Sequence, residues 1–158
     1  MPRIELDSID IKILNELQEN AKLTNVELSA RINLSPSPCL ARVRALEKAG
    51  IISRYVTLLD HGKLGLGLIV FIQVGMERQV DRNLEDFQAA ITRYPEVMEC
   101  YLMTGDFDYL IRVVVDDIPA LERFIIDKLT KISGISNIKS SVTLKQIKYE
   151  TALPLTHR

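Results

Sequence analysis

The chain has 158 residues, of which 47% are hydrophobic and 26% charged, so it can bury a core but is too short for more than two compact domains. A net charge of −1 argues against a protein that coats nucleic acid without regard to sequence. We expect a cytoplasmic location, because the first ten residues are too polar for a signal peptide and no apolar run reaches the roughly 18 to 20 residues that span a bilayer.

The N-terminal third of the chain begins with the pattern of two short helices. Asp7 stands where it can cap an apolar helical stripe that ends near Asn20. Thr24 and Glu27 have the spacing of a capping box, which predicts a second helix running to about Ile32. The apolar side chains of that helix are expected to face partly inward: Val26, Leu28, Ala30 and Ile32.

A third helix is predicted to begin within Ser35-Pro36-Ser37-Pro38, since prolines in a first turn lose no intrahelical hydrogen bond. Its inward stripe is Cys39, Val43 and Leu46. The helix should stop at Gly50, which suits a left-handed C-terminal position. The β-rich alternation from Ile51 to Leu59 then predicts a small two-stranded wing with Arg54 near its tip.

Three short helices with a tight turn before the third are typical of a helix-turn-helix, whose last helix enters the major groove of DNA. The hydroxyls of Ser35 and Ser37, the N–H groups of residues 37 and 39 and the helix dipole would suit a phosphate oxygen. Between residues 35 and 54 the charges sum to +3 in a nearly neutral chain: Arg42, Arg44, Lys48 and Arg54 against Glu47. The residues alone equally fit a solvated surface or a protein-binding bundle.

Residues 61–67 hold three glycines and predict a linker. We therefore expect a DNA-binding domain over residues 1–60 and a second domain over residues 68–158. The second domain has the order βαββαβ, which predicts a ferredoxin-like sandwich of an antiparallel sheet and two helices, and hence an α+β protein. Its expected elements are strands at 68–76, 97–104, 109–115 and 136–148 and helices at 81–93 and 119–132.

The first of these strands is apolar on both faces. Val70 and Ile72 point to one side, whereas Ile69 and Phe71 point to the other. One side should be covered by the helices of its own domain. The other is predicted to pack against the same sheet of a second subunit.

Several segments strongly resemble the Lrp/AsnC, or feast/famine, regulators, and most of all the leucine-responsive regulatory proteins within that family. They are Leu6-Asp7-Ser8-Ile9-Asp10, Ile13 to Gln18, Asn25 to Ser29, Leu34 to Leu40, Arg42 to Glu47 and Gly105-Asp106-Phe107-Asp108-Tyr109-Leu110. The resemblance implies a winged helix-turn-helix, dimers that assemble into tetramers or octamers, and double-stranded DNA wrapped or bent around a nucleoid-associated regulator. It also implies a small-molecule effector, an amino acid such as leucine or methionine.

Two sets of site residues follow. DNA contacts are expected at the starts of the second and third helices and along the positive stretch: Thr24, Asn25, Ser35, Ser37, Pro38, Arg42, Arg44, Lys48 and Arg54. The effector site that the resemblance implies maps onto Gly105, Asp106, Asp108, Tyr109 and Ser140. Without the resemblance, Gly105-Asp106 also fits an ordinary hairpin turn. Ile138 departs from the polar residue common in the family, so the resemblance does not fix which effector binds.

We predict no catalytic site, metal or cofactor, because two isolated histidines, two isolated cysteines and no phosphate-binding glycine motif offer nothing to build one. Asp116-Asp117 fits a helix cap. Two rival functions stay open at this point. One is a ligand-sensing module that binds a protein instead of DNA, and the weaker one is an amino-acid-metabolising enzyme fused to a regulatory domain.

Overall fold

The computed structural model describes residues 5–77 and 81–155 and divides the chain into two compact units. The first unit comprises residues 1–58 together with 148–158, and the second comprises residues 59–147. The outer ends of the two predicted domains, residues 1–4 and 156–158, lie outside the described part of the chain.

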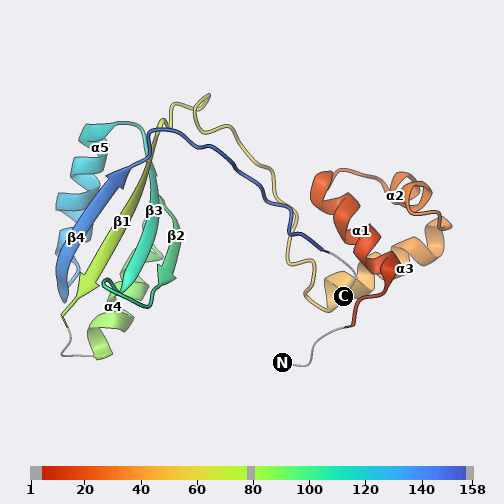
Figure 1. Cartoon of the computed structure of the whole chain (residues 1–158), viewed down its shortest axis with the longest axis horizontal. Helices are drawn as coiled ribbons and strands as arrows, with labels where there is room; N and C mark the ends of the chain where they lie inside the picture. Colours follow the sequence, from red (N-terminus) through yellow and green to blue (C-terminus); the bar gives the residue numbers. More distant parts are fainter. Residues whose placement is uncertain (1–4, 78–80, 156–158) are drawn as a thin grey trace. The chain divides into compact units, whose positions relative to one another are not determined.

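The first unit is a bundle of three helices, α1 (Ser8–Glu19), α2 (Asn25–Arg31) and α3 (Pro36–Lys48) (Figure 1). Both predicted N-terminal caps are present. The Asp7 carboxylate accepts hydrogen bonds from the Ile9 and Asp10 N–H groups at 2.9 and 2.8 Å. The Thr24 hydroxyl accepts from the Glu27 N–H at 3.2 Å, while the Thr24 N–H donates to the Glu27 carboxylate at 2.7 Å.

Two left-handed residues end α2 and α3 and set the angle at which the chain leaves each helix. Asn33 has φ 57° and Gly50 has φ 72°. The N–H of Leu34 donates to the Ser29 carbonyl at 2.9 Å, and the N–H of Ile51 donates to the Leu46 carbonyl at 3.0 Å. Both helices thus end in a Schellman motif, and the tight turn between α2 and α3 agrees with the sequence-based prediction.

The core of the first unit takes fewer residues from α2 than the sequence predicts. Leu28 and Ile32 are buried, but Val26 is 65% exposed and Ala30 is also exposed. Residues two positions apart on a helix project in nearly opposite directions, so one stripe of a short helix can be buried and its neighbours cannot. The fully packed core residues are Ile13, Leu14, Leu28, Ile32, Cys39 and Leu46.

The predicted two-stranded wing is not present, since the described chain between residues 49 and 67 contains no strand. Residues 53–59 have no glycine, proline, asparagine or aspartate to make a hairpin turn. Ile51 and Ile52 instead pack on the helical core. Tyr55 donates a hydrogen bond to Glu47 at 2.9 Å, and burial together with that bond raises the pKa of Tyr55 to about 12.

The C-terminal segment is the second departure, because residues 148–155 belong to the first unit and not to the second. The side-chain amide of Gln18 on α1 pairs with the backbone of Leu153, donating to its carbonyl at 3.2 Å and accepting from its N–H at 2.6 Å. Leu155 packs against the helical core. The predicted final strand is accordingly shorter than expected and ends at Val142.

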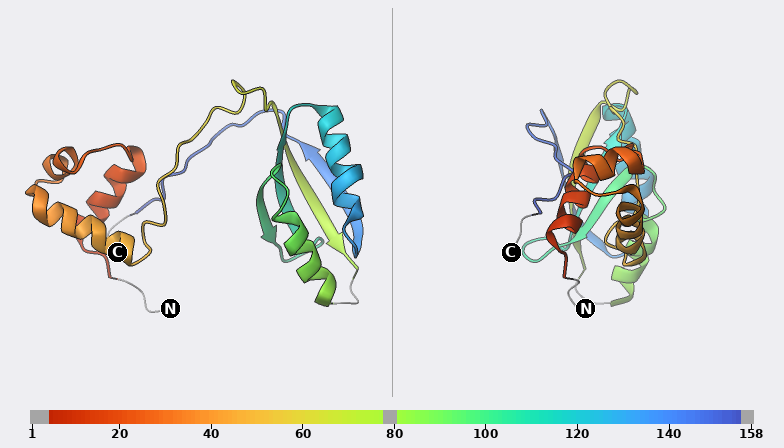
Figure 2. Two further views of the ribbon diagram at one scale, coloured as in Figure 1. Left: turned by 180° about the vertical axis from the view of Figure 1, so that it is seen from behind. Right: turned by 90° about the vertical axis from the view of Figure 1, so that its right-hand side faces the viewer.

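The second unit is a four-stranded antiparallel sheet in the order β2-β3-β1-β4, with two helical segments on one face (Figure 2, left). The strands are β1 (Leu68–Met76), β2 (Val97–Leu102), β3 (Tyr109–Val115) and β4 (Ile135–Val142). Helix α4 spans Asp81–Ile91. Helix α5 (Ile118–Arg123), which Asp117 caps at 2.7 Å, continues as a π turn (Phe124–Lys128) and a 3-10 turn (Leu129–Lys131).

The helix-covered face of this sheet forms the core of the second unit. Val70, Ile72 and Val74 of β1 are fully buried there with Phe87 of α4 and Phe124 of the π turn. This order and layering confirm the ferredoxin-like α+β prediction.

Candidate nucleic-acid and effector sites

The outward side of helix α3 is exposed and has a stripe of four residues along its middle, while the opposite side of the helix is buried through Cys39 and Leu46. The stripe consists of Ser37, Ala41, Arg44 and Lys48, at spacings of four, three and four residues. The guanidinium of Arg44 and the ammonium of Lys48 make no ion pair with the described residues. The stripe therefore presents the small Ala41 to the outside, with the Ser37 hydroxyl on one side of it and the cations of Arg44 and Lys48 on the other.

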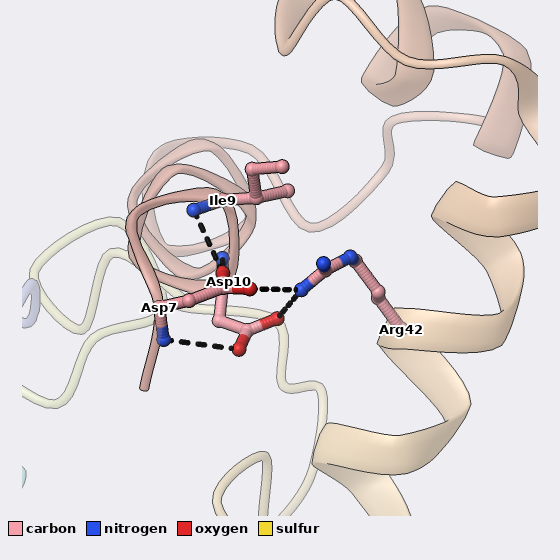
Figure 3. Close-up of polar contacts among 4 residues, drawn as sticks. All are labelled: Asp7, Ile9, Asp10 and Arg42. Carbon is pink, nitrogen blue, oxygen red and sulfur yellow. Dashed lines mark hydrogen bonds and ion pairs between the residues drawn. The ribbon is translucent and has the colours of Figure 1, made fainter. Parts of the chain in front are cut away.

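Arg42 lies off this stripe and points to α1 (Figure 3). One of its guanidinium nitrogens lies 2.7 Å from Asp7 and 2.8 Å from Asp10. The hydrogen bonds that the guanidinium donates to Asp7 and then to Asp10 raise the pKa of Arg42, so its positive charge is retained and locally balanced by two carboxylates. Arg42 was predicted to contact DNA, and in the folded unit its guanidinium joins α3 to the start of α1; the DNA contact itself stays a prediction.

The first turn of α3 carries fewer free donors than expected. Pro36 and Pro38 have no N–H, and the N–H of Cys39 donates to the Ser35 carbonyl at 3.2 Å. The predicted free N–H at Cys39 is therefore wrong. Within the described chain, the donors that this turn can still offer to a phosphate are the N–H of Ser37 and the Ser35 hydroxyl, which makes no capping hydrogen bond.

Thr24 and Asn25 lie at the start of α2, close to the start of α3. The Asn25 amide donates to the Pro36 carbonyl at 2.8 Å, so this side chain holds the two helix starts together. Thr24 is engaged in its capping box with Glu27. Arg54 is exposed in the extended segment beyond α3 and does not share its stripe.

The predicted effector loop, residues 103–108, joins β2 to β3 and is tied to the end of β1. The Asp108 carboxylate accepts from the Met76 N–H at 2.6 Å, and the Asp108 N–H donates to the Val74 carbonyl at 3.0 Å. Gly105 has φ +133°, and an added Cβ there would meet nothing within 4 Å. Gly105 and Asp106 are exposed and accessible to a ligand, whereas the Asp108 carboxylate is already bonded to the Met76 N–H.

Tyr109 and Ser140 lie in different surroundings from the loop. Tyr109 is 1% exposed, its ring centroid is 4.4 Å from that of Phe87, and its hydroxyl accepts from Gln88 at 2.8 Å. Its side chain is therefore part of the core, and its backbone is paired with β1 on one side and β2 on the other. Ser140 is exposed on β4, separated from β3 by β1 and hence by about 10 Å.

The sheet face opposite the helices carries Phe71, as predicted, together with a polar cluster that the sequence pattern did not indicate. Arg112 on β3 pairs with Glu99 on β2 at 2.6 Å, and the Tyr101 hydroxyl donates to the same carboxylate at 3.0 Å. Phe71 is 39% exposed beside them on β1. Cross-strand register would have found this cluster, but register is known only once the strands are paired.

The described residues contain no group of three or more potential metal ligands and no helix that is long and apolar enough to cross a membrane. Cys39 is buried and Cys100 exposed, both as free thiols, and burial raises the pKa of each.

Comparisons with known proteins agree on both units. Residues 6–53 match a family profile described as winged helix-turn-helix DNA-binding, and residues 69–153 match the Lrp/AsnC ligand binding domain. A leucine-responsive regulatory protein of Rhizobium meliloti is 40% identical over 146 residues, covering 92% of this chain and 94% of the relative. The one of Salmonella typhimurium is 39% identical over 157 residues, covering 99% and 96%.

The chain is also similar over nearly its whole length to solved structures of transcription regulators. A transcriptional regulator from Neisseria meningitidis, crystallised as an L-Met complex, is 47% identical with a TM-score of 0.93, covering 97% of this chain and 99% of the neighbour. AsnC of E. coli is 26% identical with a TM-score of 0.86, covering 94% and 98%.

Proposed function

The chain belongs to the Lrp/AsnC family of transcription regulators, and from this we propose that it regulates genes by binding duplex DNA through α3 in response to an amino acid. It is a DNA-binding regulator with a ligand-binding domain and not an enzyme. The family membership removes both rival functions left open by the sequence. We further infer a cytoplasmic, nucleoid-associated location from the DNA partner.

The observation that carries this proposal is the exposed stripe of α3. Ala41 at its centre lets the helix approach base edges closely, whereas Arg44 and Lys48 supply charge for phosphates or for guanine. Ser37 adds a hydroxyl and a backbone N–H at the positive end of the helix dipole. Thr24, Ser35, Pro38 and Arg54 remain proposed contacts at the edge of this surface.

We propose that two subunits pair through the open sheet faces. Phe71 is partly exposed on a face that its own helices do not cover, and the Arg112–Glu99 pair lies beside it. An exposed aromatic next to a satisfied ion pair suits an isologous interface, in which each subunit offers the same patch. A Phe71→Glu variant should shift the molecular mass measured by light scattering towards the monomer, while Lys131→Glu on the exposed side of the helical layer should not.

Dimers are proposed to join around residues 103–108 into tetramers or octamers. Leu102 is 68% and Met103 36% exposed at the edge of this loop, near Gly105, whose φ is +133°. The exposed backbone around Gly105 would bind the effector's carboxylate, and Asp106 its ammonium group. Ser140 of the same or of a neighbouring subunit completes the proposed site. The L-Met complex of the Neisseria regulator supports methionine as the first effector to test, with leucine next.

A thermal-shift screen of the twenty amino acids tests the effector, because a ligand that binds only the folded protein raises the melting temperature by mass action. We expect L-methionine or L-leucine to raise it and Asp106→Asn to weaken that response. A screen in which no amino acid changes the melting temperature would contradict the amino-acid assignment while leaving the DNA-binding proposal in place.

A further inference from the structure

The second unit has a cavity of about 390 Å³ far from the proposed effector loop. It lies at the end of β3 that holds Val115, whereas the loop joins the other end at Tyr109. Seven residues of strand separate the two ends by about 20 Å. The volume is near the lower limit of small-molecule sites, which run from roughly 300 to 1,000 Å³.

The helical wall of this cavity is irregular. Ala120, Arg123 and Phe124 line it from α5 and the start of the π turn, and Asp127 and Lys128 continue the same face. π turns inside helices recur at functional sites because they displace side chains from regular helical positions. Here the end of α5 and the π turn together place a guanidinium, a carboxylate and an ammonium group along one wall.

Glu96 provides the second and independent observation. One of its carboxylate oxygens is paired with the Lys128 ammonium, while the other, Oε2, is buried and has no hydrogen-bond partner among the described residues. Burial opposes ionisation of this carboxyl, but the hydrogen bond from Lys128, with a smaller contribution from the backbone N–H of Glu96 itself, holds its pKa below the ordinary value. A buried, ionised oxygen without a donor is costly and calls for a donor from outside the chain.

The other contacts of Lys128 are with Tyr94: the Lys128 carbonyl accepts from the Tyr94 hydroxyl at 3.5 Å, and the ammonium lies 5.5 Å from the centre of the Tyr94 ring. Neither contact supplies a donor to Glu96 Oε2, and Glu96 is among the residues that line the cavity.

The charges of the lining select the ligand class. Three carboxylates, Glu96, Asp116 and Asp127, face two cations, Arg123 and Lys128, so the lining is net negative and repels phosphates. The mixture suits a molecule with one ammonium and one carboxylate group. Apolar area on Leu66, Val115, Ala120 and Phe124 is left for a side chain.

We propose that this cavity is a second small-molecule site, which binds the zwitterion of an α-amino acid with an aliphatic side chain. The ammonium group donates to Glu96 Oε2, and the carboxylate accepts from the Arg123 guanidinium. Leu66 lies in the segment that leads into β1, so a bound ligand touches the connection between the two units of the chain. The ligand class is argued from these side chains alone, and only its regulatory meaning rests on the proposed function.

Methyl NMR of the full-length protein titrated with L-methionine tests this proposal. We expect saturable shifts of the Leu66, Val115 and Ala120 methyls, at least tenfold weaker binding in Arg123→Gln, and no change in the matched control Arg93→Gln. N-acetyl-L-methionine, which lacks the ammonium group, and L-methioninamide, which lacks the carboxylate, should both fail to shift these methyls.

Cavity methyls that stay unshifted, or that shift equally in Arg123→Gln, would overturn the second site and indicate that water alone serves Glu96. The methyls of Leu102 and Met103 report separately on the proposed effector loop. Failure of one site is thereby distinguishable from failure of the other. Glu96→Gln, which keeps the shape of the side chain, should weaken binding to the cavity and leave the response of the loop methyls intact.

Discussion

Arg42 and Arg44 are two residues apart on α3, yet they lie in different surroundings, and we predict different contributions to DNA binding. Arg44 is exposed on the outward stripe, whereas two carboxylates hold Arg42 at 2.7 and 2.8 Å. A guanidinium already balanced by Asp7 and Asp10 releases few DNA counterions. We therefore predict that Arg44→Ala lowers the salt dependence of binding and that Arg42→Ala does not.

The magnitude follows from counterion release. Each phosphate contact contributes about 0.9 to the slope of log K against log salt, so a fourfold rise in salt, for example from 50 to 200 mM, weakens each contact about 3.5-fold. A dimer has two copies of α3. The wild-type protein should then lose about 12-fold more affinity over this salt range than the Arg44→Ala dimer, if each Arg44 holds one phosphate.

Fluorescence anisotropy with a labelled operator duplex at five or six salt concentrations measures both slopes. Arg42→Ala should keep the wild-type slope but lower the melting temperature, because it frees α3 from the start of α1. Arg42→Lys should recover part of that stability. If Arg42→Ala reduced the slope as much as Arg44→Ala, Arg42 would be a phosphate contact and our interpretation of its two carboxylate partners would be refuted.

Three further predictions concern the stability of the two units: the C-terminal segment, the buried Tyr109 hydroxyl and the paired carboxylates. Ending the chain after Ile147 removes Leu153 and Leu155 from the groove beside α1. This truncation should lower the free energy of unfolding of the first unit by about 1 to 2 kcal/mol in denaturant unfolding. An unchanged unfolding midpoint would mean that the segment does not pack in this groove. Tyr109→Phe removes the hydroxyl that accepts from Gln88 and should cost about 1 kcal/mol in the same assay without abolishing effector binding, whereas loss of binding would place the hydroxyl in the effector site. The Asp10 N–H lowers the pKa of Asp7, and the Arg112 guanidinium lowers that of Glu99. A carboxyl whose pKa is lower in the folded than in the unfolded protein stabilises the fold at pH values above its unfolded pKa, and this contribution is lost as the pH falls. The free energy of unfolding should therefore fall as the pH drops below about 4, and less steeply in Asp7→Asn.

The local patterns of the sequence were sufficient for most of the fold. Both N-terminal caps, the left-handed ends of α2 and α3, and strands β1 and β3 lie where periodicity and turn residues predict them. These features depend on contacts within a few residues, which a sequence displays directly.

The larger departures from the predicted fold depend on contacts between distant parts of the chain. The alternation after Ile51 shows β-rich residues, but it contains no turn and meets no partner strand. Nothing local indicates that Leu153 pairs with Gln18, 135 residues away. Likewise, the charge count around α3 includes Arg42 because Asp7 and Asp10 come together with it only in the folded unit.

A cleavage experiment tests the central claim, that the outward stripe of α3 faces duplex DNA. An iron chelate attached to Ala41→Cys, in a Cys100→Ser protein whose remaining Cys39 is buried, cuts DNA within reach of that position. Our interpretation predicts strong cuts centred on each half of the operator, and none from the same chelate on Thr130→Cys of the second unit. Absence of cutting from position 41, in a variant that still binds the operator, would contradict it.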